Sequence, residues 1–179
     1  ARAILTGAPC VSLPLAAQTW NGASTNWSTT TNWTPTGVPA VGANIIIADT
    51  TANGLTLDSS ASRSIGSITL GATGTRTAGF TVNTGANTLT MAGGVVANGA
   101  LTGTGNVLTM RGNYVVSAAQ NWSVGGTPNS DNGVFVRGTS DSANTSPSGS
   151  LVLNANLTKS GTGQLNLASV GVSGAGNFV

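Results

Sequence analysis

From about residue 43 onward, the chain repeats a short pattern: an apolar residue, a small or β-branched residue, and a second apolar residue. In an extended chain successive side chains point to opposite faces, so the two apolar residues would face a core and the middle one would face outward. From Leu70 onward, the last apolar positions of consecutive triplets lie 9 to 19 residues apart, with no helical period between them. The sequence therefore predicts many short strands, of which the clearest are LTL (55–57), ITL (68–70), FTV (80–82), LTM (89–91), LTM (108–110), WSV (122–124), VFV (134–136), LVL (151–153) and LNL (165–167).

Two all-β architectures fit these strands. In a β-sandwich or barrel, neighbouring triplets would pair in antiparallel fashion. In a β-solenoid, equivalent triplets of successive turns would pair in parallel. The triplets are interchangeable and are followed by turns rich in Gly, Asn, Ser and Thr, which favours the solenoid.

The composition supports the same choice. Only 6% of the residues are charged, and Gly, Thr, Ser and Asn together make up half of the chain. Equivalent positions of a parallel stack lie about 4.8 Å apart, where like charges repel but Thr and Asn can form hydrogen-bonded ladders. The same numbers exclude a coiled coil, and the six scattered basic residues exclude a nucleic-acid binder. No apolar run reaches the roughly 20 residues that a transmembrane helix needs.

The two ends of the chain suggest processing and truncation. Residues 1–17 are mostly small and apolar and end in Leu-Ala-Ala, which predicts the second half of a secretory signal peptide cleaved near Ala17. The alternative is a short apolar first strand. Cys10 lies inside this stretch, and a thiol nucleophile there is excluded because the chain has no His. Residues 176–179 stop within the strand pattern, and we expect them to end a fragment of a longer polypeptide.

Two segments depart from the triplet pattern. Residues 18–42 hold three of the four tryptophans and two prolines, and we expect them to cap the first turn of a solenoid that occupies residues 43–179. Residues 129–150 hold Asp131, Asp141 and Pro147, with Pro128 directly before them, and we expect a loop near this range to project from the stack.

Several motifs in these segments resemble those of bacterial autotransporter-type surface proteins. The opening Trp-Asn-Gly (20–22), the Asn-Trp pairs (26–27 and 32–33) and Val-Pro (38–39) resemble the region that precedes the first strand in that family. LTKSGTGQLNL (157–167) is similar to the autotransporter-associated β-strand repeat, Leu-Thr-Lys-x-Gly-x-Gly-x-Leu-x-Leu. AAQNWSV (118–124) resembles the strand that often precedes the repeat. After residue 167 the chain departs from the family, because residues 171–176 lack the usual Tyr-x-Gly turn.

The resemblance implies a right-handed parallel β-helix that is secreted or displayed at the surface of a Gram-negative-type bacterium. Members of the family are mostly structural stalks, adhesins or biofilm components. The family's outer-membrane β-barrel, which anchors and exports the passenger, has no counterpart in this sequence. Export by that route is therefore an inference from the resemblance.

Trp20, Trp27 and Trp33 are the candidate binding residues. An indole face can stack on a sugar ring, and the neighbouring Asn, Ser and Thr side chains could bind its hydroxyl groups. The alternative, which we favour, is that these large rings plug the open end of the solenoid. Regular rows of Thr can also match ice, but the middle triplet position changes from Thr to Ser, Phe, Val and Asn along the chain.

Catalytic and metal sites have little support. Asp131 and Asp141 share one polar segment and could converge as a carboxylate pair that cleaves polysaccharides, or provide loop contacts. The alternative, which we favour, is that both residues form turns. With no His, no Glu and one Cys, we expect no zinc site, and we expect no cofactor.

We therefore predict a secreted, cell-surface structural or adhesive protein without enzymatic activity, acting as a stiff repeat scaffold. Surface glycans or other cells would be its partners. The alternative is a carbohydrate-binding or polysaccharide-cleaving β-helix protein.

Overall fold

The computed structural model describes residues 15–22, 24–48, 55–56, 60–70, 79–97, 107–125, 133–138 and 149–179. These residues are almost entirely β-structure, with one short 3-10 helix, η1 (Thr30–Asn32). The first sheet contains β1 (Gln18–Trp20), β2 (Trp33–Thr34), β3 (Ile45–Ile47), β6 (Ile68–Leu70), β8 (Val95–Ala97), β10 (Gln120–Val124) and β13 (Leu157–Ser160). The second sheet contains β4 (Leu55–Thr56), β5 (Arg63–Ile65), β7 (Phe80–Met91), β9 (Val107–Val116), β11 (Gly133–Arg137), β12 (Gly149–Leu153), β14 (Gln164–Ala168) and β15 (Val170–Ser173).

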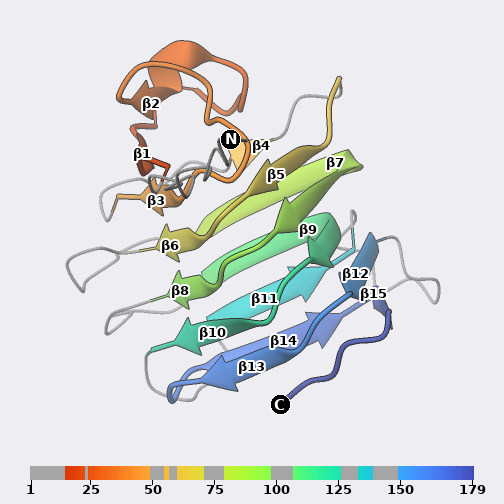
Figure 1. The fold of residues 1–179 in the computed structure, drawn as a ribbon. Helices are drawn as coiled ribbons and strands as arrows, with labels where there is room; N and C mark the ends of the chain where they lie inside the picture. Colours follow the sequence, from red (N-terminus) through yellow and green to blue (C-terminus); the bar gives the residue numbers. More distant parts are fainter. Residues whose placement is uncertain are drawn as a thin grey trace, which may run out of the picture.

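The chain alternates between the two sheets and returns one strand further along the stack each time. Ile68 of β6 pairs with Val95 of β8, which pairs with Trp122 of β10, so one turn here takes 27 residues. Among the described residues, every strand pair is parallel except β1 with β2. The result is a parallel β-solenoid of about four turns, as the repeated triplets predict (Figure 1). Its right-handedness stays a prediction.

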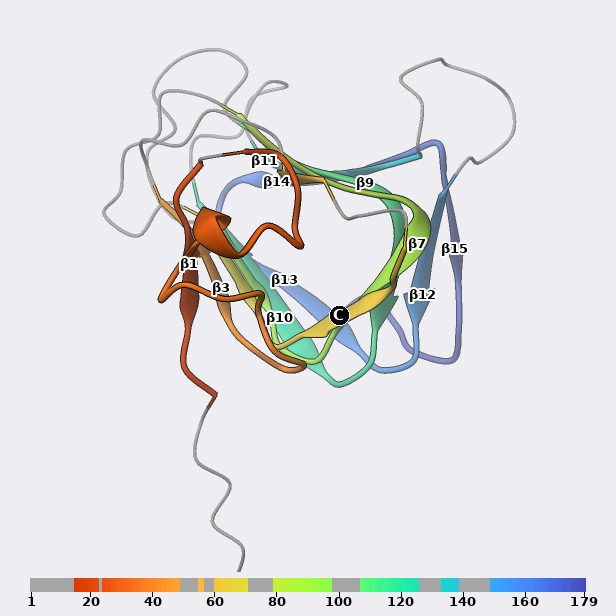
Figure 2. The same ribbon diagram turned by 90° about the horizontal axis from the view of Figure 1, so that it is seen from above.

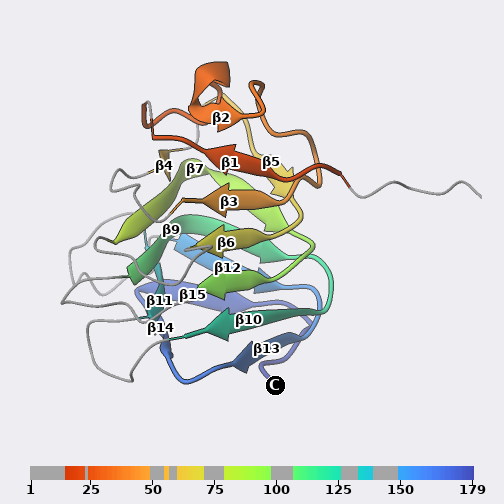
Figure 3. The same cartoon turned by 90° about the vertical axis from the view of Figure 1, so that its left-hand side faces the viewer.

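The β-sandwich alternative is wrong for this chain. Triplets that follow one another in sequence, such as those in β6 and β7, lie in different sheets and do not pair. Instead, β1, β3, β6, β8, β10 and β13 stack in parallel along one side of the molecule (Figure 3). Viewed along the stack, the strands surround one interior (Figure 2). The buried apolar side chains of the strands form one cluster there.

The predicted alternation of burial is confirmed in most described strands. In β6, Ile68 and Leu70 are buried while Thr69 between them is partly exposed, and the same holds for both ends of β7. Two middle residues depart from this alternation. Thr109 and Phe135 lie on the outer side of their strands and yet are only 7% and 4% exposed. In the last turn, the predicted inward residue Leu167 is 37% exposed.

The long strands β7 and β9 bend at glycines and so line two sides of the stack. The pairing register shifts between Asn83 and Thr88, where β7 holds more residues than β9. Gly85 has φ +56° and Gly112 has φ +101° at this corner. The corner is filled by Thr84, which is fully buried and whose hydroxyl oxygen accepts the backbone N–H of Asn113 at 2.8 Å.

Two predicted boundaries need correction. The range 129–150 is not one continuous loop, because strand β11 lies inside it and pairs with both β9 and β14. Residues 126–132 and 139–148 lie outside the described residues. The predicted capping segment also contributes a strand to the stack, since β1 pairs in parallel with β3. Because β1 has only three residues, its alternation is too short a periodic signal to predict the strand from the sequence.

Tyr114, the only tyrosine, gives the core a pH-dependent probe. It is fully buried, and its hydroxyl donates a hydrogen bond to the Val82 carbonyl at 2.6 Å. Burial raises the pKa of this phenol well above its usual value near 10, and a backbone hydrogen bond from Arg111 opposes the shift.

We therefore expect the stability of the solenoid to fall above pH 10. There the unfolded chain releases the phenolic proton that the folded chain retains, at a cost of at most about 1.4 kcal/mol per pH unit. In an alkaline titration, phenolate absorbance should rise only as the circular dichroism of the fold is lost. The variant Tyr114→Phe should lose this part of the alkaline destabilisation. Phenolate formation near pH 10 in the folded protein would contradict the burial of Tyr114.

Candidate functional site

The Trp-rich segment (residues 18–42) is the candidate site with the most described structure. Trp20 lies on β1 in register with Ile47 of β3, and its ring packs edge-on against Phe80 with centroids 4.9 Å apart. Trp27 and Trp33 pack against each other with centroids 5.1 Å apart. All three side chains are between 0% and 1% exposed.

Polar groups hold the segment in one conformation. The indole N–H of Trp33 donates to the Trp27 carbonyl at 2.8 Å, and this hydrogen bond is buried. The buried Asn32 amide donates to the Asn26 carbonyl at 2.6 Å and to Ser24 Oγ at 2.9 Å. The segment therefore closes on itself, and β2 then pairs in antiparallel fashion with β1.

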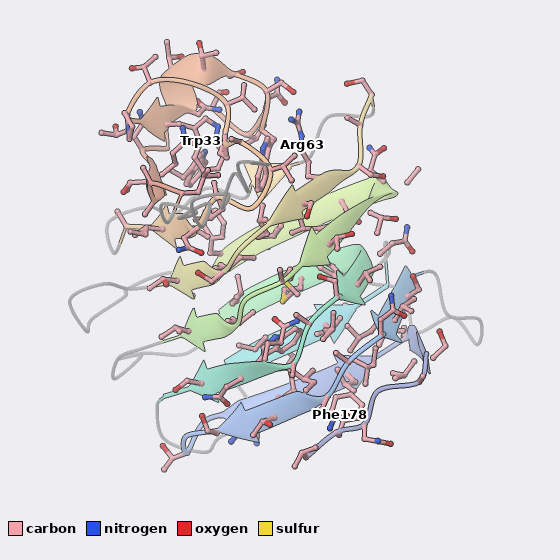
Figure 4. All side chains as sticks on the ribbon, viewed as in Figure 1. Trp33, Arg63 and Phe178 are labelled. Carbon is pink, nitrogen blue, oxygen red and sulfur yellow. The ribbon has the colours of Figure 1, made fainter. Side chains whose placement is uncertain are left out.

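Arg63 links the segment to the solenoid. It is in register with Leu89, which is in register with Tyr114, so it continues a row of inward-facing residues. Its guanidinium donates from Nη2 to Ser28 Oγ at 2.9 Å, and Figure 4 shows it rising from β5 at the same end as Trp33. An aliphatic residue at this position would have no hydrogen-bond donor to offer to Ser28. Arg63 combines an aliphatic stem, which continues the inward row, with a donor that reaches the Trp-rich segment.

The buried indoles leave no ring face for a sugar to stack on. The indole N–H groups of Trp20 and Trp27 are also buried and have no hydrogen-bond partner, so they offer no polar contact to a ligand. Burial of large rings beyond the first turn is what an end cap requires. The capping role stays a prediction, and the arrangement favours it over carbohydrate binding.

The candidate carboxylates cannot be placed together. Asp131 and Asp141 lie outside the described residues, as do Asp49 and Asp58. In the described ranges, no group of three or more His, Cys, Asp or Glu residues is arranged to hold a metal ion. Nor does any helix of the described part have the length and apolar character needed to cross a membrane.

The outer side of β7, β9 and β11 carries a feature that we did not predict. Arg111 and Arg137 occupy equivalent positions on neighbouring turns, and the Arg137 guanidinium carbon lies 4.9 Å from the centre of the Phe135 ring. Each arginine directly follows a triplet, so an alignment of triplets would have revealed the pair.

In the adjacent outward row, Thr81 and Thr109 are followed by Phe135 and Asn166, which interrupts the Thr array that ice binding requires.

The opposite end of the stack exposes apolar side chains. There, Phe178 forms a parallel bridge with Leu157, and β14 and β15 complete the last turn. A groove of about 450 Å³ opens at this end, lined by Lys159, Gly163, Gln164, Leu165, Asn166, Leu167 and Phe178.

The repeat-like motif 157–167 lies at this end and has a clear structural basis. It forms β13, a turn and β14, and the strand that resembles its usual predecessor, β10, is its parallel neighbour. At Gly161 a side chain would collide with the Val124 carbonyl, and at Gly163 with the Gly125 carbonyl. The two glycines of the motif are therefore required because the turn packs directly on the backbone of the previous turn.

Comparison of the chain with protein-family models, with curated proteins and with solved structures finds no match. The solenoid is therefore established by the strand pairing itself. The resemblance to autotransporter-type proteins rests on the motifs quoted above.

Proposed function

We propose that this chain is a stiff structural scaffold, secreted or displayed at a bacterial cell surface as an autotransporter-like passenger with an adhesive role. The observation that carries the proposal is the parallel stack of about four turns with one continuous core. A repeat scaffold is what such a stack provides, since each turn contacts only its neighbours and all turns share one axis.

The stiffness follows from the direction of the bonds. Backbone hydrogen bonds between successive turns run along the axis at about 4.8 Å per turn, so bending the rod would stretch a whole ladder at once. Rows of inward side chains such as Ile47, Leu70 and Ala97 continue through the turns without a gap. The outward Thr, Ser and Asn side chains keep the long surface polar with few charges, and Arg111 and Arg137 are one pair of like charges in register.

Export is supported by the position of the first strand. Leu15, Ala16 and Ala17 are exposed, and β1 begins at Gln18, directly after the predicted cleavage position. N-terminal sequencing of the protein recovered from the cells that make it should therefore begin at Gln18, and protease added to intact cells should degrade it. A protein that keeps residues 1–17 and survives this treatment would contradict export and display.

The rival function is carbohydrate binding or cleavage, and it makes a different prediction. Because all four tryptophans are between 0% and 1% exposed, acrylamide should quench their fluorescence weakly until the protein is unfolded. Added oligosaccharides should leave the emission unchanged, and incubation with polysaccharides should release no products. A saturable change in emission would support the rival. Cleavage that is lost in the double variant Asp131→Ala, Asp141→Ala would show that the scaffold proposal is wrong.

A further inference from the structure

We propose that Arg111 of β9 and Arg137 of β11 together bind one tetrahedral oxyanion, a phosphate or sulfate group, on the outer side of the second sheet. The proposal assigns a binding site and does not rest on export or adhesion. Strand β7 flanks the pair on one side and strand β14 on the other. The site therefore lies within the stack and does not depend on where the sequence begins or ends.

The pair departs from the way this chain otherwise places charge. The whole chain has six basic and four acidic residues, and the described residues include four basic side chains and no acidic one. Two of these four, Arg111 and Arg137, are in register on neighbouring strands, where equivalent positions lie about 4.8 Å apart. Like charges this close repel each other, and an anion that contacts both would remove the repulsion.

The residues that surround the pair on its own face are neutral. In the same outward row, Arg111 is preceded by Asn83 on β7, and Arg137 is followed by Ala168 on β14. The adjacent outward row consists of Thr81, Thr109, Phe135 and Asn166. Neither row of this face supplies a carboxylate, so charge complementarity favours an anionic ligand.

Phe135 holds one of the two guanidinium groups. The guanidinium carbon of Arg137 lies over the Phe135 ring, 4.9 Å from its centre, and the ring is almost fully buried. The Arg137 Nε atom is buried as well, so the Nη groups are the ones that can meet an anion. The N–H donors of a guanidinium lie in its plane, so a ring against its face leaves the donors at its edge able to bind.

Both arginines have the capacity to take a ligand in addition to their contacts within the chain. Each is partly exposed, so solvent reaches part of each side chain. Each also interacts with other groups of the chain. Because a guanidinium carries five N–H donors, those interactions and an anion can share it.

The number of oxygens selects the ligand class. A guanidinium binds two oxygens side by side through parallel N–H groups, so the two oxygens of a carboxylate satisfy one arginine. Phosphate and sulfate have four oxygens and carry up to two negative charges, so one ion can bridge both arginines. Since the site is partly exposed to water, we expect a dissociation constant on the order of 1 mM.

An NMR titration of the whole chain, labelled with nitrogen-15, tests the proposal at neutral pH and constant ionic strength with chloride as the background anion. Sodium phosphate and sodium sulfate should shift the amide and guanidinium signals of Arg111 and Arg137 to saturation. Each ion should give one dissociation constant for both residues. Sodium acetate should bind at least about tenfold more weakly, because a carboxylate cannot bridge the pair.

Variants separate this site from a general attraction between the basic protein and anions. Arg111→Gln and Arg137→Gln should each weaken phosphate binding by at least about tenfold. Arg111→Gln leaves the contact of Arg137 with Phe135 in place, so it remains informative if Arg137→Gln is poorly folded. The control Lys159→Gln removes the same single charge from β13 in the first sheet, and it should bind phosphate as the wild type does.

Two sources can supply the oxyanion, a free ion or a lipid headgroup. Sedimentation with phosphatidylcholine vesicles that contain phosphatidic acid distinguishes them. If the group belongs to a lipid, the vesicles should carry down the wild type but not Arg111→Gln. If the site takes the free ion, both proteins should stay in solution while the NMR titration still saturates.

Three results would overturn the proposal. The first is that phosphate and sulfate leave the signals of Arg111 and Arg137 unchanged, as expected if aspartates of the chain already neutralise the pair. The second is that acetate binds as tightly as phosphate. The third is that Lys159→Gln weakens phosphate binding as much as Arg111→Gln does, which would reduce the effect to overall charge.

Discussion

Replacing Leu108 with Asp is expected to unfold the solenoid. Leu108 lies on β9 between Phe80 and Val134 of the neighbouring turns, and none of the three side chains is more than 1% exposed. A carboxylate at this position would lose its hydration and meet only apolar atoms. We expect a loss of more than about 4 kcal/mol, which is a large part of the 5–15 kcal/mol that stabilises a typical domain.

The control for this variant is Val115→Asp on the same strand. Val115 lies in an outward row between Thr90 and Val152 and is partly exposed, so its carboxylate would remain in water. We expect a cost within about 1 kcal/mol. Guanidinium unfolding, followed by tryptophan fluorescence, measures both variants. If Leu108→Asp does not fold, Leu108→Ala should still fold with a loss of about 2–5 kcal/mol. Equal stability of the two Asp variants would show that the inward register is wrong.

Replacing Gly112 with Ala is expected to have the second largest effect. Gly112 is buried at the corner of β9 and has φ +101°, a conformation that residues with a side chain rarely adopt. An added Cβ would also collide with the Thr84 hydroxyl and lie 3.1 Å from the Gly85 carbonyl. The hydroxyl cannot simply move away, because its oxygen is held by the Asn113 N–H. Backbone strain and the collision together should cost about 3–5 kcal/mol.

Gly85→Ala separates these two contributions. Gly85 lies at the corner of the neighbouring turn with φ +56°, but nothing lies within 4 Å of an added Cβ. It should cost only the left-handed backbone strain, about 1–2 kcal/mol. Thermal or chemical unfolding of the two variants under the same conditions gives the comparison. If Gly112→Ala is no less stable than Gly85→Ala, the corner is not packed as tightly as described.

The strands and their inward side chains were largely predictable from the sequence. The pattern Phe80-Thr81-Val82 predicts a strand with Phe80 and Val82 buried, and the structure shows this. The same local rule fails at Phe135, which lies on the outer side of β11 and yet is 4% exposed. Which other segment covers an outward residue depends on contacts that alternation does not encode.

The candidate site was less predictable than the fold. The neighbours of Trp27 and Trp33 in the sequence are Asn, Ser and Thr, which suit a sugar-binding surface as well as a buried turn. Burial of both rings results from packing within the folded Trp-rich segment. The inward position of Arg63 was also hidden, because a lone Arg before Ser64 and Ile65 carries no sign of the row that it shares with Leu89.

By itself, the sequence determined that this protein is all-β, that its strands are short and that alternate residues of each strand point inward. These properties follow from the geometry of an extended chain and concern residues that are neighbours in sequence. Only the tertiary structure decided which strands pair, where the chain turns its corners and which end of the stack exposes its core. Those properties arise from contacts between residues about one turn apart, such as Ile68 and Val95, and a strand shows the same alternation whichever partner it has.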